Sequence, residues 1–206
     1  MPKNIVPNII ESGKIVLASG NSGKLREVQA VLDQQRFTLI KQSEFDVPDV
    51  PETGSTFVEN AIIKARHAAQ LTGLPTLADD SGIEVDALQG APGVYSARYA
   101  GEHGADDANN TKLLNEMKNV AEEQRTARFQ CVIVYMRHAE DPMPLICEGS
   151  WEGIILHDLT GPNGFGYDPL FFVPTHGCSS AELDPAEKNR ISHRALALQK
   201  LISKLQ

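Results

Sequence analysis

Two adjacent carboxylates follow a short apolar segment, and they are the residues of this chain best suited to metal chemistry. Residues 74–78 lead directly into Asp79 and Asp80, which are followed by Ser81 and Gly82. Neighbouring carboxylates repel each other and resist burial, and a cation offsets both costs. Mg²⁺ prefers carboxylate oxygen, and one or two protein carboxylates plus substrate phosphates suffice to hold it. The pattern predicts a metal site where a buried strand ends in an acidic turn; a purely structural Asp-Asp turn is the alternative.

The direction of the two carboxylates depends on whether the strand continues through them. In a strand, successive side chains point to opposite faces, so only one of Asp79 and Asp80 would then face a substrate. Glu52, at the end of a proline-rich loop, and Glu59, in the first turn of an expected helix, are candidate second ligands.

A short segment near the start of the chain is suited to binding an anion. A β-rich run, residues 14–18, is followed by a glycine-containing turn and then by helical spacing. Backbone N–H groups and the helix dipole attract anions at such a junction, and Lys24 adds a charge. It is not a Walker A loop, because its glycines are three residues apart and Leu25 stands where Ser or Thr would bind magnesium. A plain turn with a solvated lysine is the alternative. The segment consists of Ser19, Gly20, Asn21, Ser22, Gly23 and Lys24.

A glycine-rich loop carries two aromatic residues beside a carboxylate. Phe165 and Tyr167 flank Gly166, and Asp168 precedes Pro169. Aromatic faces stack on purine bases, and Asp168 could accept a hydrogen bond from a ring N–H. The alternative is that both rings pack into the core and that Asp168 is a turn residue.

A basic group stands near the C-terminus. His193 and Arg194 follow Ser192 at an expected helix start, with Lys188 nearby. They supply hydrogen-bond donors without a metal, which favours ligand contact, although a lone histidine is more often structural. Together the basic and acidic segments predict a metal-dependent enzyme that acts on phosphates.

The spacing of apolar and punctuating residues predicts the elements that position these groups. Helices are expected over residues 24–35, from Thr56 to a stop at Gly73, after Asp106 or Asp107 as cap, after the Asp184–Pro185 capping signal, and again from Ser192. Strands are expected over 14–18, 37–40, 75–78, 83–88, 128–135, 145–156 and 170–173. Helices interleave with strands first and hairpin-like strands follow. This order predicts an α/β fold with a mixed sheet, in two lobes around a central cleft.

Composition limits the class of protein. The 206 residues are 41% hydrophobic, which suits a single domain over residues 1–206, with residues 1–13 as a loose leader. The net charge of −8 argues against a nucleic-acid-binding surface. The three cysteines have no zinc spacing, no signal peptide is evident and no apolar run could span a membrane, so we expect a cytoplasmic protein.

With these residues identified, the chain resembles the inosine/xanthosine triphosphate pyrophosphatase family, in its bacterial dITP/XTP pyrophosphatase form. The resemblance runs from about Lys14 to Leu205. Each motif alone is a modest signal, but seven motifs in the same order are specific for the family. The motifs are residues 19–24, 52–54, 57–61, 77–82, 90–98, 164–169 and 191–194.

The resemblance implies an elongated fold, a homodimer, dependence on Mg²⁺, and hydrolysis of ITP, dITP and XTP to the monophosphate and pyrophosphate. Asp80 would be the catalytic base and a metal ligand, with Ser81 touching the substrate. Glu52 is our choice of second metal ligand, ahead of Asp49 and Glu59. Residues 19–24 would hold the triphosphate, and Phe165, Gly166, Tyr167 and Asp168 the base and sugar. Lys188, His193 and Arg194 would complete the nucleotide site.

Two alternatives use the same residues. A non-catalytic purine-nucleotide sensor would bind through the same loops, although the acidic pair argues against it. A phosphatase would release orthophosphate instead of pyrophosphate.

Overall fold

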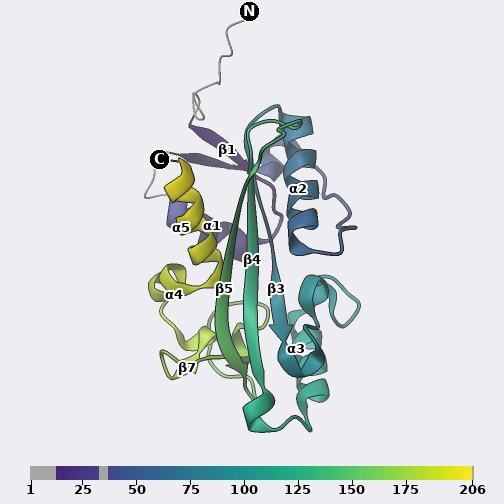
Figure 1. The fold of residues 1–206 in the computed structure, drawn as a ribbon, viewed down its shortest axis with the longest axis vertical. Coiled ribbons are helices and arrows are strands. Elements are labelled where there is room, and N and C mark those ends of the chain that lie inside the picture. Colours follow the sequence, from purple (N-terminus) through teal and green to yellow (C-terminus); the bar gives the residue numbers. More distant parts are fainter. Residues whose placement is uncertain (1–12, 33–36, 206) are drawn as a thin grey trace, which may run out of the picture. The chain divides into compact units, whose positions relative to one another are not determined.

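The computed structural model describes residues 13–32 and 37–205, and its strands form one seven-stranded sheet with helices packed around it (Figure 1). The strand order is β2-β1-β3-β4-β5-β6-β7. β1 pairs in parallel with β2 and β3, whereas β6 pairs antiparallel with β5 and β7. The predicted mixed sheet is therefore confirmed. The strands are β1 (Lys14–Leu17), β2 (Thr38–Lys41), β3 (Thr76–Val85), β4 (Thr126–Met136), β5 (Leu145–Ile155), β6 (Phe171–Val173) and β7 (Cys178–Ser179).

The chain divides into two compact units. The first unit contains the described residues up to Asp79, Ile133–Cys147 and the end of the chain from Leu198; the second contains Asp80–Val132 and Glu148–Ala197. The boundary falls between the two carboxylates of β3. The expectation of a central cleft stays a prediction.

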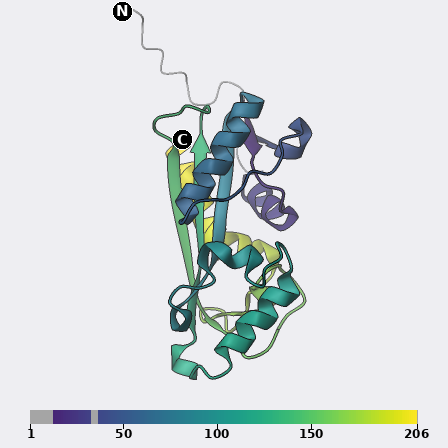
Figure 2. The same ribbon diagram turned by 90° about the vertical axis from the view of Figure 1, so that its right-hand side faces the viewer.

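In the first unit, α1 (Ser22–Leu32) and α2 (Phe57–Thr72) accompany the buried strand β1. Thr56 caps α2, because its side chain accepts from the Glu59 N–H while Glu59 bonds back. Gly73 ends the helix in the left-handed conformation at φ 66°. The small buried residues of α2 allow close approach to β1, and Figure 2 shows the helix lying along the strands of its unit. They are Asn60, Ala61, Ala65, Ala68 and Ala69.

The second unit is built on an aromatic core. Phe129 of β4, Trp151 of β5 and Phe171 of β6 are in mutual ring contact, with centroids 4.6–6.3 Å apart. α3 (Asp106–Met117) adds Leu113 and Met117 to this core. α4 (Pro185–Ile191) starts at Asp184, whose side chain accepts from the Ala186 N–H, as the capping signal predicted. α5 (His193–Leu205) begins in this unit.

Two local predictions are wrong. β3 runs unbroken from Thr76 to Val85, so Asp79 and Asp80 lie within a strand and not at a turn that ends one. The apolar residues Ile83 and Val85 continue the strand as part of the core, and this burial overrides the turn preference of Ser81-Gly82. Neither Asp106 nor Asp107 caps α3, because the helix starts at Asp106 and Ala105 is its N-cap.

The remaining boundaries agree to within a residue or a few. The strand predicted at 37–40 is Thr38–Lys41, and the loop predicted over 41–55 contains one short 3₁₀ turn, Gln42–Phe45. Residues 33–35 of the first predicted helix and residues 1–12 of the predicted leader lie outside the described residues.

Candidate functional site

The carboxylate pair of β3 is buried. Asp79 is 1% exposed and Asp80 is 5% exposed. Because they are successive strand residues, their side chains point to opposite faces of the sheet. In the first unit, the Oδ1 atom of Asp79 lies 3.3 Å from the Nζ atom of Lys24, and the lysine side chain is itself only 16% exposed. Asp79 therefore fixes the lysine that the sequence assigned to anion binding.

The turn before α1 is organised by Asn21. Its Oδ1 atom accepts from the N–H groups of Gly23 at 2.9 Å and Lys24 at 3.0 Å, which is N-terminal capping of the helix. The Ser19 hydroxyl accepts from the Asn21 N–H at 3.3 Å. An anion that bound through the N–H groups of Gly23 and Lys24 would have to displace the Asn21 side chain. The exposed residues Gly20 and Ser22 complete this turn.

The three candidates for a second metal ligand have different surroundings, all in the first unit. Glu52 accepts a hydrogen bond from Lys64 Nζ at 2.9 Å. Asp49 accepts from Gln42 at 2.9 Å, and its carboxylate lies beside Gly20, whose added Cβ would be 3.7 Å from Asp49 Oδ1.

Glu59 is the least suited of the three. Its Oε2 atom accepts from the backbone and hydroxyl groups of both Ser55 and Thr56 at 2.8–3.0 Å. These bonds, those of the Ser55 and Thr56 hydroxyls foremost, hold the pKa of Glu59 below its usual range. Its carboxylate is committed to capping α2.

Lys64 is a further candidate that the sequence analysis did not select. Its side chain is 14% exposed and forms an ion pair with Glu52. No local pattern marked it, because its partner Glu52 lies 12 positions earlier in the chain. Lys64 is thus, like Lys24, a half-buried cation of the first unit held by a carboxylate.

The donor chemistry of the chain fits Mg²⁺ at Asp80. Among residues 13–32 and 37–205, no group of three or more His, Cys, Asp and Glu side chains is placed to hold a metal. Mg²⁺ does not need one, since one or two carboxylates and substrate phosphates complete its shell. Asp80 is a buried hard-oxygen donor. In the first unit, the Asp49 carboxylate lies beside Gly20 of the cationic turn, and Glu52 lies beside Lys64.

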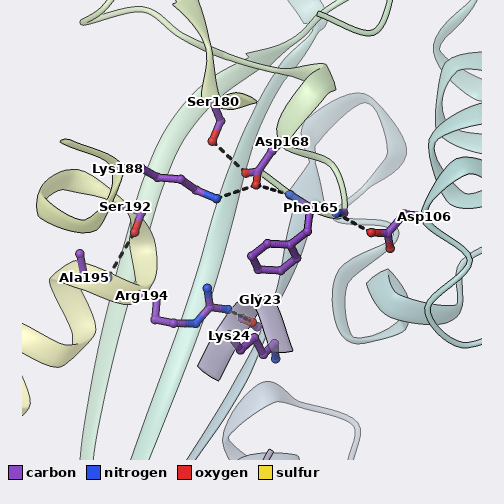
Figure 3. Close-up of polar contacts among 12 residues, drawn as sticks. Gly23, Lys24, Asp106, Phe165, Asp168, Ser180, Lys188, Ser192, Arg194 and Ala195 are labelled. Atoms are coloured by element: carbon purple, nitrogen blue, oxygen red, sulfur yellow. Dashed lines mark hydrogen bonds and ion pairs between the residues drawn. The ribbon is translucent and has the colours of Figure 1, made fainter. Parts of the chain in front are cut away.

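In the second unit, two cations frame the ring of Phe165 (Figure 3). Lys188 Nζ lies 5.0 Å from the ring centroid and the Arg194 guanidinium carbon lies 5.9 Å from it. Arg194 is 2% exposed, and its guanidinium donates to the hydroxyl of Ser81 at 2.9 Å. Phe165, Lys188, Arg194 and Ser81 therefore belong to one group of contacts, and its use as a nucleotide site stays a prediction.

Asp168 anchors Phe165 and Lys188 through hydrogen bonds. One carboxylate oxygen accepts from the Ser180 hydroxyl at 2.8 Å, and the other accepts from Lys188 at 2.5 Å and from the Phe165 N–H at 2.9 Å (Figure 3). Asp168 is 2% exposed. Its observed contacts position the loop and Lys188; acceptance of a base N–H stays a prediction.

Two further predicted site residues, Tyr167 and His193, make contacts with core residues of the second unit. The Tyr167 ring lies in the core, and its hydroxyl donates to the Ser96 carbonyl at 2.8 Å. Burial raises the pKa of this hydroxyl, so it stays a neutral donor. The His193 ring stacks on Phe129 at 4.7 Å. Because the Tyr167 ring packs in the core, Phe165 is the aromatic residue of this loop that is less buried, and a role for Tyr167 in the nucleotide site stays a prediction.

An α/β sheet with a lysine-bearing strand–helix turn, a buried acidic pair and an aromatic ring framed by cations defines a nucleotide-handling enzyme. Comparison with known proteins makes this class specific. The model of the Ham1 family matches residues 15–204, and the chain belongs to that family. The predicted family resemblance is thereby confirmed.

Curated relatives and solved structures agree over nearly the whole chain. A dITP/XTP pyrophosphatase of Vibrio cholerae is 61% identical over 94% of this chain and 96% of its own. One from Escherichia coli O157:H7 is 55% identical over 94% and 98%. The structure of a HAM1 protein from Coxiella burnetii superimposes with a TM-score of 0.86 at 56% identity, covering 93% of this chain and 98% of its own. No helix within the described ranges is both long and apolar enough to cross a membrane.

Proposed function

We propose that this chain hydrolyses the purine nucleoside triphosphates ITP, dITP and XTP to the nucleoside monophosphate and pyrophosphate. The observation that carries the proposal is the 55–61% identity, over 93–94% of the chain, to proteins named dITP/XTP pyrophosphatase. The geometry of the second unit supports it, since Phe165 offers a face to a base and the flanking cations favour an anionic ligand.

The reaction is an in-line attack of water on the α-phosphorus, with pyrophosphate as the leaving group. Asp80 orients the water and accepts its proton. An ordinary aspartate has a pKa near ~3.9 and is a weak base at neutral pH. When bound, Mg²⁺ supplies the complementary chemistry, because it lowers the pKa of water and neutralises phosphate charge. Asp80 would hold it, with Glu52 or Asp49 as a second ligand.

In this proposal, residues of the first unit bind the phosphates of the substrate. Lys24, fixed by Asp79, and Lys64, fixed by Glu52, are cations whose positions are set by buried or half-buried carboxylates. Preorganised charges of this kind stabilise developing charge without reorganising in the transition state. The Ser19–Lys24 turn adds hydroxyl and backbone donors.

In this proposal, residues of the second unit distinguish one purine base from another. Hypoxanthine and xanthine present an acceptor oxygen at position six, whereas adenine presents a donor. Arg194 is a donor that cannot lose its charge, so it favours the oxo form and leaves adenine mismatched. The His193 ring is stacked on Phe129, and a contact of His193 with the base stays a prediction.

A panel of nucleoside triphosphates tests the proposal, with pyrophosphate and orthophosphate measured separately in the presence of Mg²⁺. We expect stoichiometric pyrophosphate from ITP, dITP and XTP, little from ATP, and a loss of roughly 100-fold or more in Asp80→Asn. Orthophosphate as the first product would indicate a phosphatase. Tight ITP binding with neither product would indicate a sensor.

Assembly and location are further parts of the proposal. We infer a homodimer in the cytoplasm, acting on small nucleotides and not on nucleic acid. The net charge of −8 and three free cysteines are consistent with this, because free thiols persist in reducing compartments. Light scattering of the purified protein measures the assembly directly.

A further inference from the structure

Two side chains of α3 contact the same residue of the loop that carries Phe165. Asp106 Oδ2 accepts from the Gly166 N–H at 2.7 Å, and Asn110 Nδ2 donates to the Gly166 carbonyl at 2.9 Å (Figure 3 shows the Asp106 contact). Asp106 and Asn110 are four residues apart and therefore lie on one face of the helix. Together they hold the N–H and the C=O of Gly166 at once.

These contacts serve the loop and not the helix. Ala105 is the N-cap of α3, and no side chain caps it. Asp106 and Asn110 instead reach residues that are 60 and 56 positions away in the chain. Asn110 is 4% exposed, so its amide is committed to a buried contact.

The loop needs such outside contacts because its backbone is intrinsically permissive. Gly164 and Gly166 both adopt left-handed conformations, at φ 82° and 60°. A Cβ added to Gly166 would meet no atom within 4 Å, so the backbone conformation and not lack of space calls for glycine. Glycine loses more conformational freedom on ordering than any other residue.

Holding Gly166 fixes the orientation of Phe165. The Phe165 N–H is bonded to Asp168 on one side, and the peptide that follows it is bonded to α3 on the other. The ring is thereby kept beside Lys188 and Arg194 before any ligand arrives. A binding surface ordered in advance avoids the entropy cost of ordering it on binding.

We propose that Asp106 and Asn110 are positioning residues for purine recognition, which act by clamping the Gly166 peptide and so presenting the Phe165 ring. This inference rests on the proposed function, in that Phe165 is taken as the contact to the base. Neither residue touches the substrate.

Hydrogen exchange of the Gly166 amide in the ligand-free protein tests the clamp without reference to activity. We expect Asp106→Ala to accelerate this exchange by roughly tenfold or more, because a charge-assisted hydrogen bond is removed. Asp107→Ala is the matched control, since it removes an equal charge from the same helical turn at an exposed position. Equal exchange rates in the two variants would overturn the clamp.

Steady-state kinetics test whether the contacts of Asp106 and Asn110 with Gly166 affect recognition of the purine base. Asp106→Ala and Asn110→Ala should each raise KM for ITP by roughly tenfold with kcat within about twofold, whereas inhibition by inorganic tripolyphosphate, which lacks a base, stays unchanged. Asp106→Asn, which keeps an acceptor oxygen, should be intermediate. Asn115→Ala, at an exposed position of the same helix, is the control for Asn110.

The outcomes separate this inference from the proposed function. A parallel loss of tripolyphosphate affinity, or an unchanged KM, would overturn the positioning role. Absence of pyrophosphate release from the unmodified protein would overturn the proposed function, and the exchange experiment would still decide whether the clamp exists.

Discussion

Replacement of Asp168 by Asn should destabilise the second unit strongly. The Asp168 and Lys188 side chains are 3% and 8% exposed, and their charged atoms are 2.5 Å apart. Removing one partner of a buried ion pair leaves the other charge uncompensated, which costs about 3–5 kcal/mol. The substitution also places an amide where two donors, the Phe165 N–H and Lys188, converge on one oxygen. We therefore expect a free energy of unfolding lower by about 3–5 kcal/mol.

Urea unfolding followed by tryptophan fluorescence is the appropriate assay. Trp151 is the single tryptophan of the chain and lies in the core of the second unit, so its signal reports on the unit that contains the pair. The midpoint should fall with little change in the dependence on urea concentration. Asp158→Asn, at an exposed position of the same unit, should change the stability by less than about 0.5 kcal/mol.

The double variant Asp168→Asn/Lys188→Met sharpens the test. If the cost arises from an unpaired buried charge, the double variant should be less destabilised than the sum of the two single variants, by at least about 1 kcal/mol. A loss below about 1 kcal/mol in Asp168→Asn, or strict additivity of the two changes, would refute this reasoning.

Further predictions concern packing, acid stability and selectivity. Gly149→Ala should destabilise the protein by about 1–3 kcal/mol or more, because the added Cβ would lie 2.0 Å from the backbone carbonyl oxygen of His193. Urea unfolding should show a lower midpoint than that of the unmodified protein, and an unchanged midpoint would contradict this. The Arg137 guanidinium holds the pKa of the Asp141 carboxyl below its usual range, so this carboxylate stabilises the fold fully above the unfolded pKa near ~3.9 and loses its contribution as pH falls below it. The stability difference between the unmodified protein and Asp141→Asn should therefore be about 1–3 kcal/mol at pH 7 and shrink toward pH 3; a difference independent of pH would refute this. Arg194→Ala should reduce the ratio of kcat/KM for ITP to that for ATP by roughly tenfold or more, and an unchanged ratio would remove Arg194 from base recognition.

Local sequence patterns predicted the helix boundaries well. Thr56 with Glu59 three residues later, Gly73, and Asp184 before Pro185 all act through backbone groups within four residues of themselves. Such interactions depend on neighbouring residues only, so these three could be predicted without knowledge of the fold, whereas Asp106 contacts the distant Gly166 and does not cap α3.

Features that depend on distant segments could not be predicted. The choice between Phe165 and Tyr167 as the ring left to face a ligand is set by contacts from Ser96, Asp106 and Asn110, more than 50 residues away. The buried Arg125 is a further example, because its guanidinium donates to three backbone carbonyls, and no local pattern marks it. Those carbonyls belong to Met117, Ile155 and Leu156.

For the acidic pair, Asp79 and Asp80, the sequence predicted some features and missed others. Its residue types predicted a metal ion, which stays a prediction, whereas the cation observed on Asp79 is Lys24, a residue that the sequence assigned to anion binding. Its position within a continuous strand was missed, since burial of Ile83 and Val85 is a property of the assembled core.

Hydrolysis of ITP in ¹⁸O-labelled water tests the central claim most directly, because the label marks the phosphorus that water attacks. Attack on the α-phosphorus, with Asp80 as the base, predicts that the label appears in the inosine monophosphate and that the released pyrophosphate carries none. Label in the pyrophosphate, or in orthophosphate, would contradict the account.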